Sequence, residues 1–502
     1  MTEPRAQRSP RVIAIASGKG GVGKSLLAAN VSVFLATLSK KVVAIDASFG
    51  AANLHRLVGV PRPQGRLADS LRKNGVPLAE TLESSSVPGL ELISGFDSPP
   101  WTANPRPQQI ATVAEQLRTI DADYVVLDLG SGTGASGLDL AEAADEVVLV
   151  ATPEPTSVEL AYRWMLTAFL RRLMSSEIAD QARELIREHF ASPLPPPLDL
   201  HRVAADESPA LADGIAEAID GFNPGLVVNW ARSKADIDLG LALTAAVRRR
   251  FGLPVHFLGH LEYDDAVWVS LRHGRPLLIE HPEVRVSKCI EKVTRRLMGR
   301  PSAPSFDELA SEPSCYAQLE VDPGATEEEI RRSMRRLRTV YSPESVVVAG
   351  LYEPVELERL REQLEAAYDT VMDPVKRKQY DQDLFPDGVP VKSALVPTLP
   401  AAAPPPEERP PMPKIEASEI TGDLLRQARE ARGIDLREIA EHTKIGMTYL
   451  DAIENETFGK LPAEVYVRGF LTEYAKMIGL DSGQVVDSYL RRLRDATGDL
   501  TT

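Results

Sequence analysis

Cysteine is scarce in this chain of 502 residues: there are only two, Cys289 and Cys315, with no CxxC pattern and no neighbouring histidine. A disulfide framework is therefore excluded, and a structural zinc or an iron–sulfur cluster held within one chain is not expected. No apolar run of about 18 residues occurs, so no membrane-spanning helix is predicted. The first eleven residues are polar and lack the apolar core of a secretory signal. These absences predict a soluble, cytoplasmic protein.

Basic residues are outnumbered. The chain carries 57 Lys and Arg against 72 Asp and Glu, a formal net charge of −15. Residues 1–305 are nearly balanced, with 33 basic and 35 acidic residues, so the excess of acid lies in the last 197 residues. Non-specific affinity for nucleic acids comes from Lys and Arg side chains that replace condensed counterions. We therefore expect the C-terminal part to bind proteins rather than phosphate backbones.

Residues 11–300 contain short Val-, Ile- and Leu-rich runs separated by amphipathic stretches. Such runs are typical of strands buried on both faces of a parallel sheet that is wrapped by helices. We predict an α/β domain over 11–300, with a doubly wound, mostly parallel sheet. A segment at about 175–222 breaks the alternation and is assigned no role. The expected strands are VIAIAS (12–17), KVVAID (41–46), YVVLDL (124–129), EVVLVAT (146–152), GLVVNW (225–230) and VHFLGH (255–260).

The pattern changes near residue 300 to short helical stretches rich in Arg and Glu. Ten of the 28 residues between 386 and 413 are proline, which is typical of an extended spacer. Helical periodicity returns at about residue 418. We therefore predict two small all-α domains, 306–385 and 418–495, joined by a Pro-rich linker at 386–417.

Residues 18–25, GKGGVGKS, fit the pattern GxxxxGK[ST] between an expected strand and an expected helix. The glycines let successive backbone N–H groups surround an anion, and the positive end of the following helix points at the same place. Lys24 is expected to neutralise the β- and γ-phosphates of ATP, and the Ser25 hydroxyl to bind Mg²⁺. Asp128 ends an expected strand, where its carboxylate could hold a Mg²⁺-bound water; its alternative role is that of a simple cap.

Several separated motifs resemble the MinD/ParA class of deviant P-loop ATPases, and most of all its FlhG-type members, which place flagella. They are KGGVGKS (19–25), VVAIDASFGAANLH (42–55), DYVVLDLGSGTG (123–134), ATPEPTSVELAY (151–162), VVNW (227–230) and LGHLEYDDAVWVSLRHGRPLL (258–278). The resemblance covers most of residues 11–300. It implies that Lys19 reaches the phosphates of a partner subunit in an ATP-sandwiched homodimer, and that Asn229 contacts adenine. Related redox and metal-carrier P-loop proteins use a cysteine pair, which this region lacks.

The expected site can now be given in full. Its catalytic candidates are Lys19, Lys24, Asp46 and Asp128, and its metal ligands are Ser25 and Asp128. The nucleotide-binding candidates are Gly18, Lys19, Gly20, Gly21, Val22, Gly23, Lys24, Ser25, Leu26 and Asn229.

One position departs from the family pattern. The family has an Asp two residues beyond the position of Asp46, where it orients the attacking water, and this chain has Ser48 there. A hydroxyl cannot accept a proton or hold a metal-linked water as strongly as a carboxylate does. Nucleotide binding is therefore expected, whereas hydrolysis is left open and could be weak or lost.

Residues 315–385 resemble a J-domain in CYAQLEVDPGATEEEIRRSMRRLRTVY and LEAAYDTVMDPVKRKQYD. Ser342-Pro343-Glu344 stands where that family has the His-Pro-Asp needed to engage a chaperone ATPase, so co-chaperone activity is not expected. Residues 419–495 resemble the helix-turn-helix domain of the bacterial cytoskeletal adaptor RodZ. The expected second helix, 447–456, carries three carboxylates, and the module has 11 basic and 14 acidic residues. Specific DNA binding is therefore not expected.

Together these features predict an ATP-dependent dimerising switch that acts in spatial positioning or polarity, at a division site, a flagellum or the cytoskeleton. Its tethered C-terminal modules are expected to recruit protein partners, with cytoskeletal proteins as candidates. The hydrophobic side chains expected to contact such partners are Tyr449, Phe458 and Tyr466. Membrane contact is left open. The alternative is a transcriptional or partition regulator that binds DNA through the helix-turn-helix domain.

Overall fold

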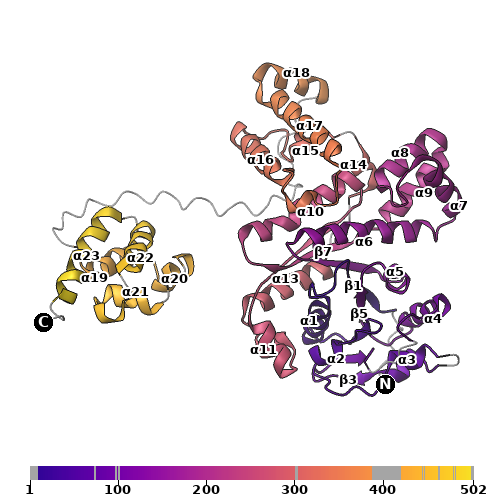
Figure 1. Cartoon of the computed structure of the whole chain (residues 1–502), viewed down its shortest axis with the longest axis horizontal. Coiled ribbons are helices and arrows are strands. Elements are labelled where there is room, and N and C mark those ends of the chain that lie inside the picture. Colours follow the sequence, from indigo (N-terminus) through magenta and orange to yellow (C-terminus); the bar gives the residue numbers. More distant parts are fainter. Residues whose placement is uncertain are drawn as a thin grey trace, which may run out of the picture. The chain divides into compact units, whose positions relative to one another are not determined.

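The computed structural model describes residues 9–386 and 420–498, apart from residues 73–74, 97–98, 100–101, 300–303, 312, 433, 444, 446, 462–463, 479 and 481. The chain divides into two compact units, Met1–Val396 and Pro397–Thr502 (Figure 1). The predicted linker at 386–417 lies almost wholly outside the described residues. None of the described helices is both long enough and apolar enough to cross a bilayer.

The first unit is built on one eight-stranded sheet with the order β3-β4-β2-β5-β1-β6-β7-β8. All neighbouring strands are parallel except β3, which pairs antiparallel with β4 at one edge. The predicted doubly wound, mostly parallel sheet is confirmed. The strands are β1 Arg11–Ser17, β2 Val42–Ala47, β3 Glu83–Ser84, β4 Leu90–Ile93, β5 Tyr124–Ser131, β6 Glu146–Ala151, β7 Gly225–Ala231 and β8 His256–Glu262.

Both faces of the sheet are covered, and β1 shows why its sequence is apolar throughout. Val12 and Ala14 belong to the hydrophobic core on one face, whereas Ile13 and Ile15 belong to the core on the other. A strand buried on both faces has no position for an exposed polar side chain. The helices of this region are α1 Lys24–Thr37, α2 Leu54–Leu57, α3 Leu67–Ser70, η1 Leu78–Thr81, α4 Pro107–Leu117, α5 Ala135–Glu142, α6 Pro155–Leu173, α10 Lys234–Phe251, α11 Ala266–His273, α12 Leu277–Glu280 and α13 Arg285–Met298.

The segment that interrupts the strand–helix alternation folds as three helices between α6 and β7. They are α7 Ala179–His189, α8 Pro197–Glu207 and α9 Pro209–Asp220. Pro197 and Pro209 each occupy the first position of a helix, where the missing N–H has no intrahelical acceptor to lose. Of the three, α7 is amphipathic and buries Ala182 and Leu185.

Residues 304–386 pack against the sheet domain within the same unit, so the expectation that this module is tethered and separate is wrong. Figure 1 shows these helices beside α10 and on the far side of α6 from the sheet. Their buried side chains, such as Tyr316 and Tyr341, join the hydrophobic core of the larger domain. The elements are α14 Phe306–Ala310, α15 Cys315–Gln318, α16 Glu327–Val340, η3 Val346–Val348, α17 Pro354–Met372 and α18 Pro374–Leu384.

The second unit is helical around a core of its own. Tyr474 and Tyr489 are fully buried there, together with Leu and Ile side chains from each long helix. Its elements are α19 Gly422–Glu430, α20 Leu436–Thr443, α21 Met447–Glu454, η4 Phe458–Lys460, α22 Glu464–Met477 and α23 Ser482–Gly498. The predicted all-α fold of this region is confirmed.

Candidate nucleotide site

The loop 18–23 leads from β1, in the middle of the sheet, into the N-terminus of α1. Gly23 has φ of 96°, and a Cβ there would lie 2.2 Å from Asn229 Nδ2. A Cβ on Gly18 would lie 2.0 Å from the Leu160 carbonyl oxygen of α6. Glycine is therefore required at both positions because neighbouring elements approach the loop backbone closely. Gly20 and Gly21 complete a loop whose N–H groups can surround an anion at the helix end.

Asn229, near the end of β7, contacts this loop. Its Nδ2 donates a hydrogen bond to the Val22 carbonyl oxygen at 2.8 Å, and its Oδ1 accepts one from the Trp230 N–H at 2.9 Å. The Asn229 side chain is only 2% exposed. The structure thus brings together Asn229 and the loop, which are 207 residues apart in sequence. Leu26 lies in the first turn of α1.

Asp46 and Asp128 lie in the C-terminal halves of the adjacent parallel strands β2 and β5, and they are register partners. Both are essentially inaccessible, with 1% and 0% exposure. Burial raises the pKa of Asp46 to about 6. Burial and the charge of Asp46 raise the pKa of Asp128 to about 7, against the opposing effects of Ser25 and Lys24. Two buried carboxylates at the mouth of a phosphate loop therefore sit in an environment that lacks sufficient positive charge.

Asp128 is the less satisfied of the two carboxylates. Within the described part of the chain, neither of its oxygens has a hydrogen-bond partner of normal geometry. Lys24 is 8% exposed, makes no ion pair among the described residues, and has its pKa lowered by burial despite the charge of Asp128. A buried carboxylate without a partner is costly. The Asp128 carboxylate and the Ser25 hydroxyl fit a Mg²⁺ ion, which prefers hard oxygen ligands.

Asp46, in contrast, is occupied by backbone. Its Oδ1 accepts from the Ser48 N–H at 3.2 Å and its Oδ2 from the Leu54 N–H at 2.9 Å. It therefore fixes the segment 48–54 that follows β2. The Ser48 side chain is 9% exposed, and its hydroxyl makes one long contact, 3.4 Å, with the Leu129 carbonyl oxygen.

The Lys19 side chain is paired with α6 rather than with its own phosphate loop. Its ammonium forms an ion pair with Glu154 and lies 3.3 Å from the Thr156 hydroxyl, at the N-terminus of α6. Sequence reasoning missed Glu154 as the partner because 135 residues separate the two. The motif ATPEPTSVELAY contains it, but a glutamate before a Pro-started helix gives no signal of its own.

Comparisons with known proteins agree with this geometry. A ParA family model, described as a NUBPL iron-transfer P-loop NTPase, matches residues 8–173. That stretch contains no cysteine, so the iron transfer of the description has no thiolate ligand there. The N-terminal part of the chain is a P-loop NTPase of the ParA/MinD type. A DnaJ domain model matches residues 314–381, and a helix-turn-helix domain model matches residues 424–485.

Three curated relatives each match about 30% of this chain. The chain is 34% identical over 154 residues to the septum site-determining protein MinD of Synechocystis, covering 30% of this chain and 57% of that protein. It is 33% identical over 154 residues to the antiactivator FleN of Pseudomonas aeruginosa, covering 30% and 54%. It is 34% identical over 163 residues to the flagellum site-determining protein YlxH of Helicobacter pylori, covering 30% and 51%. The matched segments thus span about half the length of these relatives.

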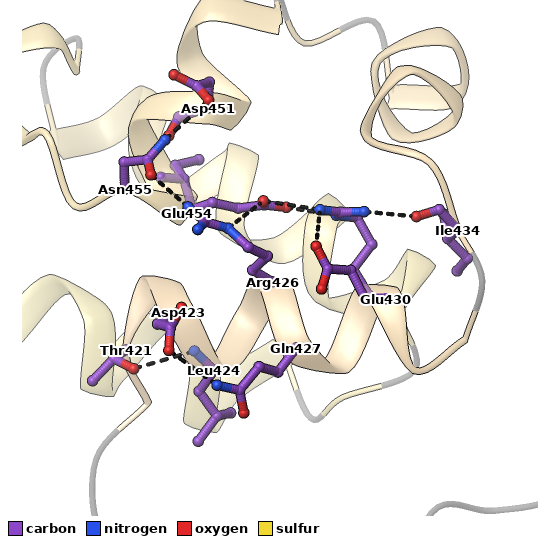
Figure 2. Close-up of polar contacts among 12 residues, drawn as sticks. Thr421, Asp423, Leu424, Arg426, Gln427, Glu430, Ile434, Asp451, Glu454 and Asn455 are labelled. Carbon is purple, nitrogen blue, oxygen red and sulfur yellow. Dashed lines mark hydrogen bonds and ion pairs between the residues drawn. The ribbon is translucent and has the colours of Figure 1, made fainter.

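The helix-turn-helix unit buries a polar network around Glu454 of α21, the expected second helix. The Glu454 carboxylate accepts from Arg429 Nε at 2.7 Å, from Arg426 Nε at 3.2 Å and from the Tyr474 hydroxyl. Figure 2 shows Arg426 of α19 pointing toward Glu454 and Asn455. Burial alone would raise the pKa of Glu454, but these hydrogen bonds hold it below its usual range.

The expectation that the helix 447–456 presents three carboxylates is therefore wrong for two of them, and α21 itself ends at Glu454. Glu454 is 5% exposed, and Glu456 pairs with Arg492 at 2.6 Å and accepts the Gly422 N–H at 2.8 Å. Asp451 remains exposed. Of the predicted hydrophobic contacts, Tyr449 is 37% exposed, as expected. Phe458 is partly buried against Tyr489, and the Tyr466 side chain lies outside the described residues.

The structure also places one cysteine in a setting that the sequence does not reveal. Cys289 on α13 lies with His260 and Glu262 of β8, with their ligand-type atoms within 4.8 Å of one another. Glu262 is paired with Arg285 at 3.5 Å, which opposes a cation there. The statement that no histidine is near a cysteine holds along the chain but not in space.

Proposed function

We propose that this protein is an ATP-dependent dimerising switch of the ParA/MinD type that acts in the cytoplasm to position a division site, a flagellum or another polar structure. The observation that carries the proposal is the pairing of two lysines in one phosphate loop with an unsatisfied buried carboxylate, Asp128. Relatives named for septum and flagellum site determination support the positioning role. Protein partners are expected at the C-terminal modules.

This chain's own residues suit the parts of the task. Backbone N–H groups of loop 18–23 would hold the phosphates, Lys24 would neutralise their charge, and Ser25 and Asp128 would hold Mg²⁺. When bound, Mg²⁺ neutralises phosphate charge and polarises the transferred group. Asn229 would contact the base, and Lys19 must leave Glu154 before it can reach the phosphates of a second subunit.

Light scattering tests the switch directly. The mass of the full chain should double with Mg²⁺ and a non-hydrolysable ATP analogue. Lys24→Ala should abolish both nucleotide binding and the doubling, and Lys19→Ala should abolish only the doubling. Lys376→Ala, which removes an exposed lysine of α18, is the matched control and should dimerise normally. A wild-type chain that binds the analogue and stays monomeric contradicts the proposal.

Hydrolysis is the part that Ser48 puts at issue. Single positioned acid–base or oxyanion groups contribute roughly 10²–10⁴ in rate, and Ser48 offers none of the charge that a carboxylate would supply. We propose that the wild-type chain hydrolyses ATP near background and that Ser48→Asp raises the steady-state rate. Brisk wild-type turnover that Lys24→Ala abolishes and Ser48→Asp leaves unchanged would show that this position is irrelevant.

For the C-terminal unit we propose protein binding rather than specific DNA binding. With Glu454 and Glu456 turned inward, the support comes from what α21 exposes: Met447, Tyr449, Asp451 and no basic residue. Base and phosphate recognition requires Arg, Lys, Asn or Gln side chains at the groove. Gel retardation with the full chain should show no saturable, sequence-dependent complex at about 10⁻⁸ M. Such a complex would favour the regulator instead.

A further inference from the structure

The J-like module, residues 304–386, is held against the NTPase by three sets of contacts. The first involves the helices inserted between α6 and β7. The Phe306 N–H donates to Asp220 at the end of α9 at 2.6 Å, and the Phe306 ring, 1% exposed, meets the His201 ring at 4.5 Å. The inserted segment, which the sequence left without a role, therefore forms one wall of the module's seat.

The second set joins α10 to the module. Arg250 donates to Asp199 of the inserted segment at 2.6 Å and to Glu356 of α17 at 2.8 Å. Arg249 donates to the Gln318 carbonyl oxygen at 2.6 Å and stacks over the Tyr341 ring at 5.4 Å. Each of these arginines joins the NTPase to the J-like module.

The third set joins the module to α6. The short helix η3 directly follows the Ser-Pro-Glu sequence that replaces His-Pro-Asp. Its Val347 is 3% exposed, and the Val347 carbonyl oxygen accepts from the buried Tyr162 hydroxyl at 2.7 Å. Gly350 lies against the Glu159 side chain. The loop of this J-like module is therefore engaged with its own chain.

The first two turns of α6 also touch the phosphate loop. Leu160 lies against Gly18, and Glu154 and Thr156 hold Lys19. Within residues 154–162, Glu154, Thr156 and Leu160 contact the nucleotide loop. Glu159 and Tyr162 contact residues 347–350 of the J-like module. An element that two sites touch can couple them only if it has two arrangements that both sites bias. The structure shows one arrangement, in which Lys19 is paired with Glu154 at the start of α6; the second, in which Lys19 leaves Glu154 for phosphate, belongs to the proposed switch.

We propose that the J-like module is a built-in regulator of the switch that acts through α6. Docking of η3 holds α6 where Glu154 retains Lys19, and so opposes nucleotide-driven dimerisation. By linkage, dimerisation loosens the docked module and makes residues 345–351 available. This inference rests on the proposed dimerising switch and adds the internal partner that restrains it.

The test compares two variants of the full chain, each of which replaces one valine of the J-like module by aspartate. Val347→Asp puts a carboxylate into the contact with α6, whereas Val375→Asp puts one on a side chain of the same module that is 77% exposed. Light scattering as a function of analogue concentration should show half-maximal dimerisation of Val347→Asp at an analogue concentration at least about fivefold lower than for the wild type. Val375→Asp should match the wild type.

Hydrogen exchange supplies the second measurement. In the wild type, residues 345–351 should exchange faster when the analogue and Mg²⁺ are added, while α17 stays protected. If Val347→Asp unfolds the module, as loss of α17 protection would show, Tyr162→Phe replaces it, because that change removes only the hydrogen bond to Val347. Dimerisation of the wild type with unchanged exchange at 345–351, and equal nucleotide dependence in all variants, overturns the coupling. A wild type that never dimerises contradicts the switch itself.

Discussion

Two buried carboxylates, one in each unit, have opposite environments. Asp128 is fully buried and accepts no hydrogen bond of normal geometry among the described residues, and burial raises its pKa to about 7 even though Ser25 and Lys24 lie close enough to oppose the rise. Glu454 is almost as buried, accepts hydrogen bonds from Arg429, Arg426 and Tyr474, and has its pKa lowered. The same functional group is satisfied by the fold in one unit and left for a ligand in the other.

This contrast distinguishes Glu454, which the fold itself satisfies, from Asp128, which we propose binds a ligand. A buried charge is tolerated when the protein itself supplies the counter-charge and the hydrogen bonds. Where the protein supplies neither, the unliganded fold pays in stability and a bound ion recovers it. The sequence shows nothing of this, because neither the apolar run around Asp128 nor the polar stretch around Glu454 reveals which side chains approach from elsewhere in the chain.

Glu454→Ala should have the largest effect. It removes the buried carboxylate partner of Arg429, which is itself 9% exposed, and leaves, among the described residues, only the longer ion pair with Glu430 at 3.4 Å. Breaking a buried pair in this way costs about 3–5 kcal/mol. Denaturant unfolding of the full chain should show the transition of the C-terminal unit moving to lower denaturant while that of the first unit stays. Asp451→Ala, on the exposed side of the same helix, is the control. Equal small effects from both would mean that the network is not stabilising.

Asp128→Asn should behave in the opposite way. Removing an unsatisfied carboxylate should leave the nucleotide-free first unit as stable as before or more stable. Loss of a metal-orienting group should weaken Mg²⁺-dependent nucleotide binding by about 10–100-fold. Calorimetric titration with and without Mg²⁺ measures this.

The control for this change is the binding of nucleotide in EDTA. There, Asp128→Asn should differ little from the wild type because the metal contribution is absent. A variant that loses both stability and metal-free binding would make Asp128 a structural residue like Glu454.

The two units should also respond differently to pH. Asp46 and Asp128 have folded-state pKa values, about 6 and about 7, above the unfolded value near 3.9, so the stability they confer is lost as pH rises through 6 to 7. The nucleotide-free first unit should therefore gain stability from pH 7 to pH 5. Glu454 and Glu456 have lowered pKa values, so the second unit should hold over that range and lose stability only below about pH 4.3. Thermal unfolding at pH 7, 5 and 3.5 checks both directions.

Local pattern was sufficient to predict much of the fold. The six expected strands are β1, β2, β5, β6, β7 and β8, because buried parallel strands need continuous apolar runs. The edge strand β3 and its neighbour β4, of two and four residues, were missed because so short a run has no distinguishable period. The phosphate loop was predictable because its glycines, lysine and serine are contiguous.

The remaining features depend on contacts that sequence spacing does not encode. Three of them join residues far apart along the chain. They are the pairing of Lys19 with Glu154, the packing of the J-like module on α6, and the burial of Glu454 against other helices. The carboxylates of the expected helix 447–456 were predicted to be exposed, because helical periodicity alone cannot show that Arg429 and Arg492 approach from other helices. The roles of the individual nucleotide-site residues remain predictions.

Scanning calorimetry of the full chain, with and without Mg²⁺ and a non-hydrolysable ATP analogue, tests the contrast between the units most directly. The Glu454→Ala change assigns the transition of the second unit. At a ligand concentration 100 times Kd, binding should stabilise the first unit by about 2.7 kcal/mol and leave the second transition where it was. Asp128→Asn should reduce that shift. A first-unit transition that ignores Mg²⁺ and the analogue, or an equal upward shift of both transitions, would contradict a ligand site at the unsatisfied carboxylate.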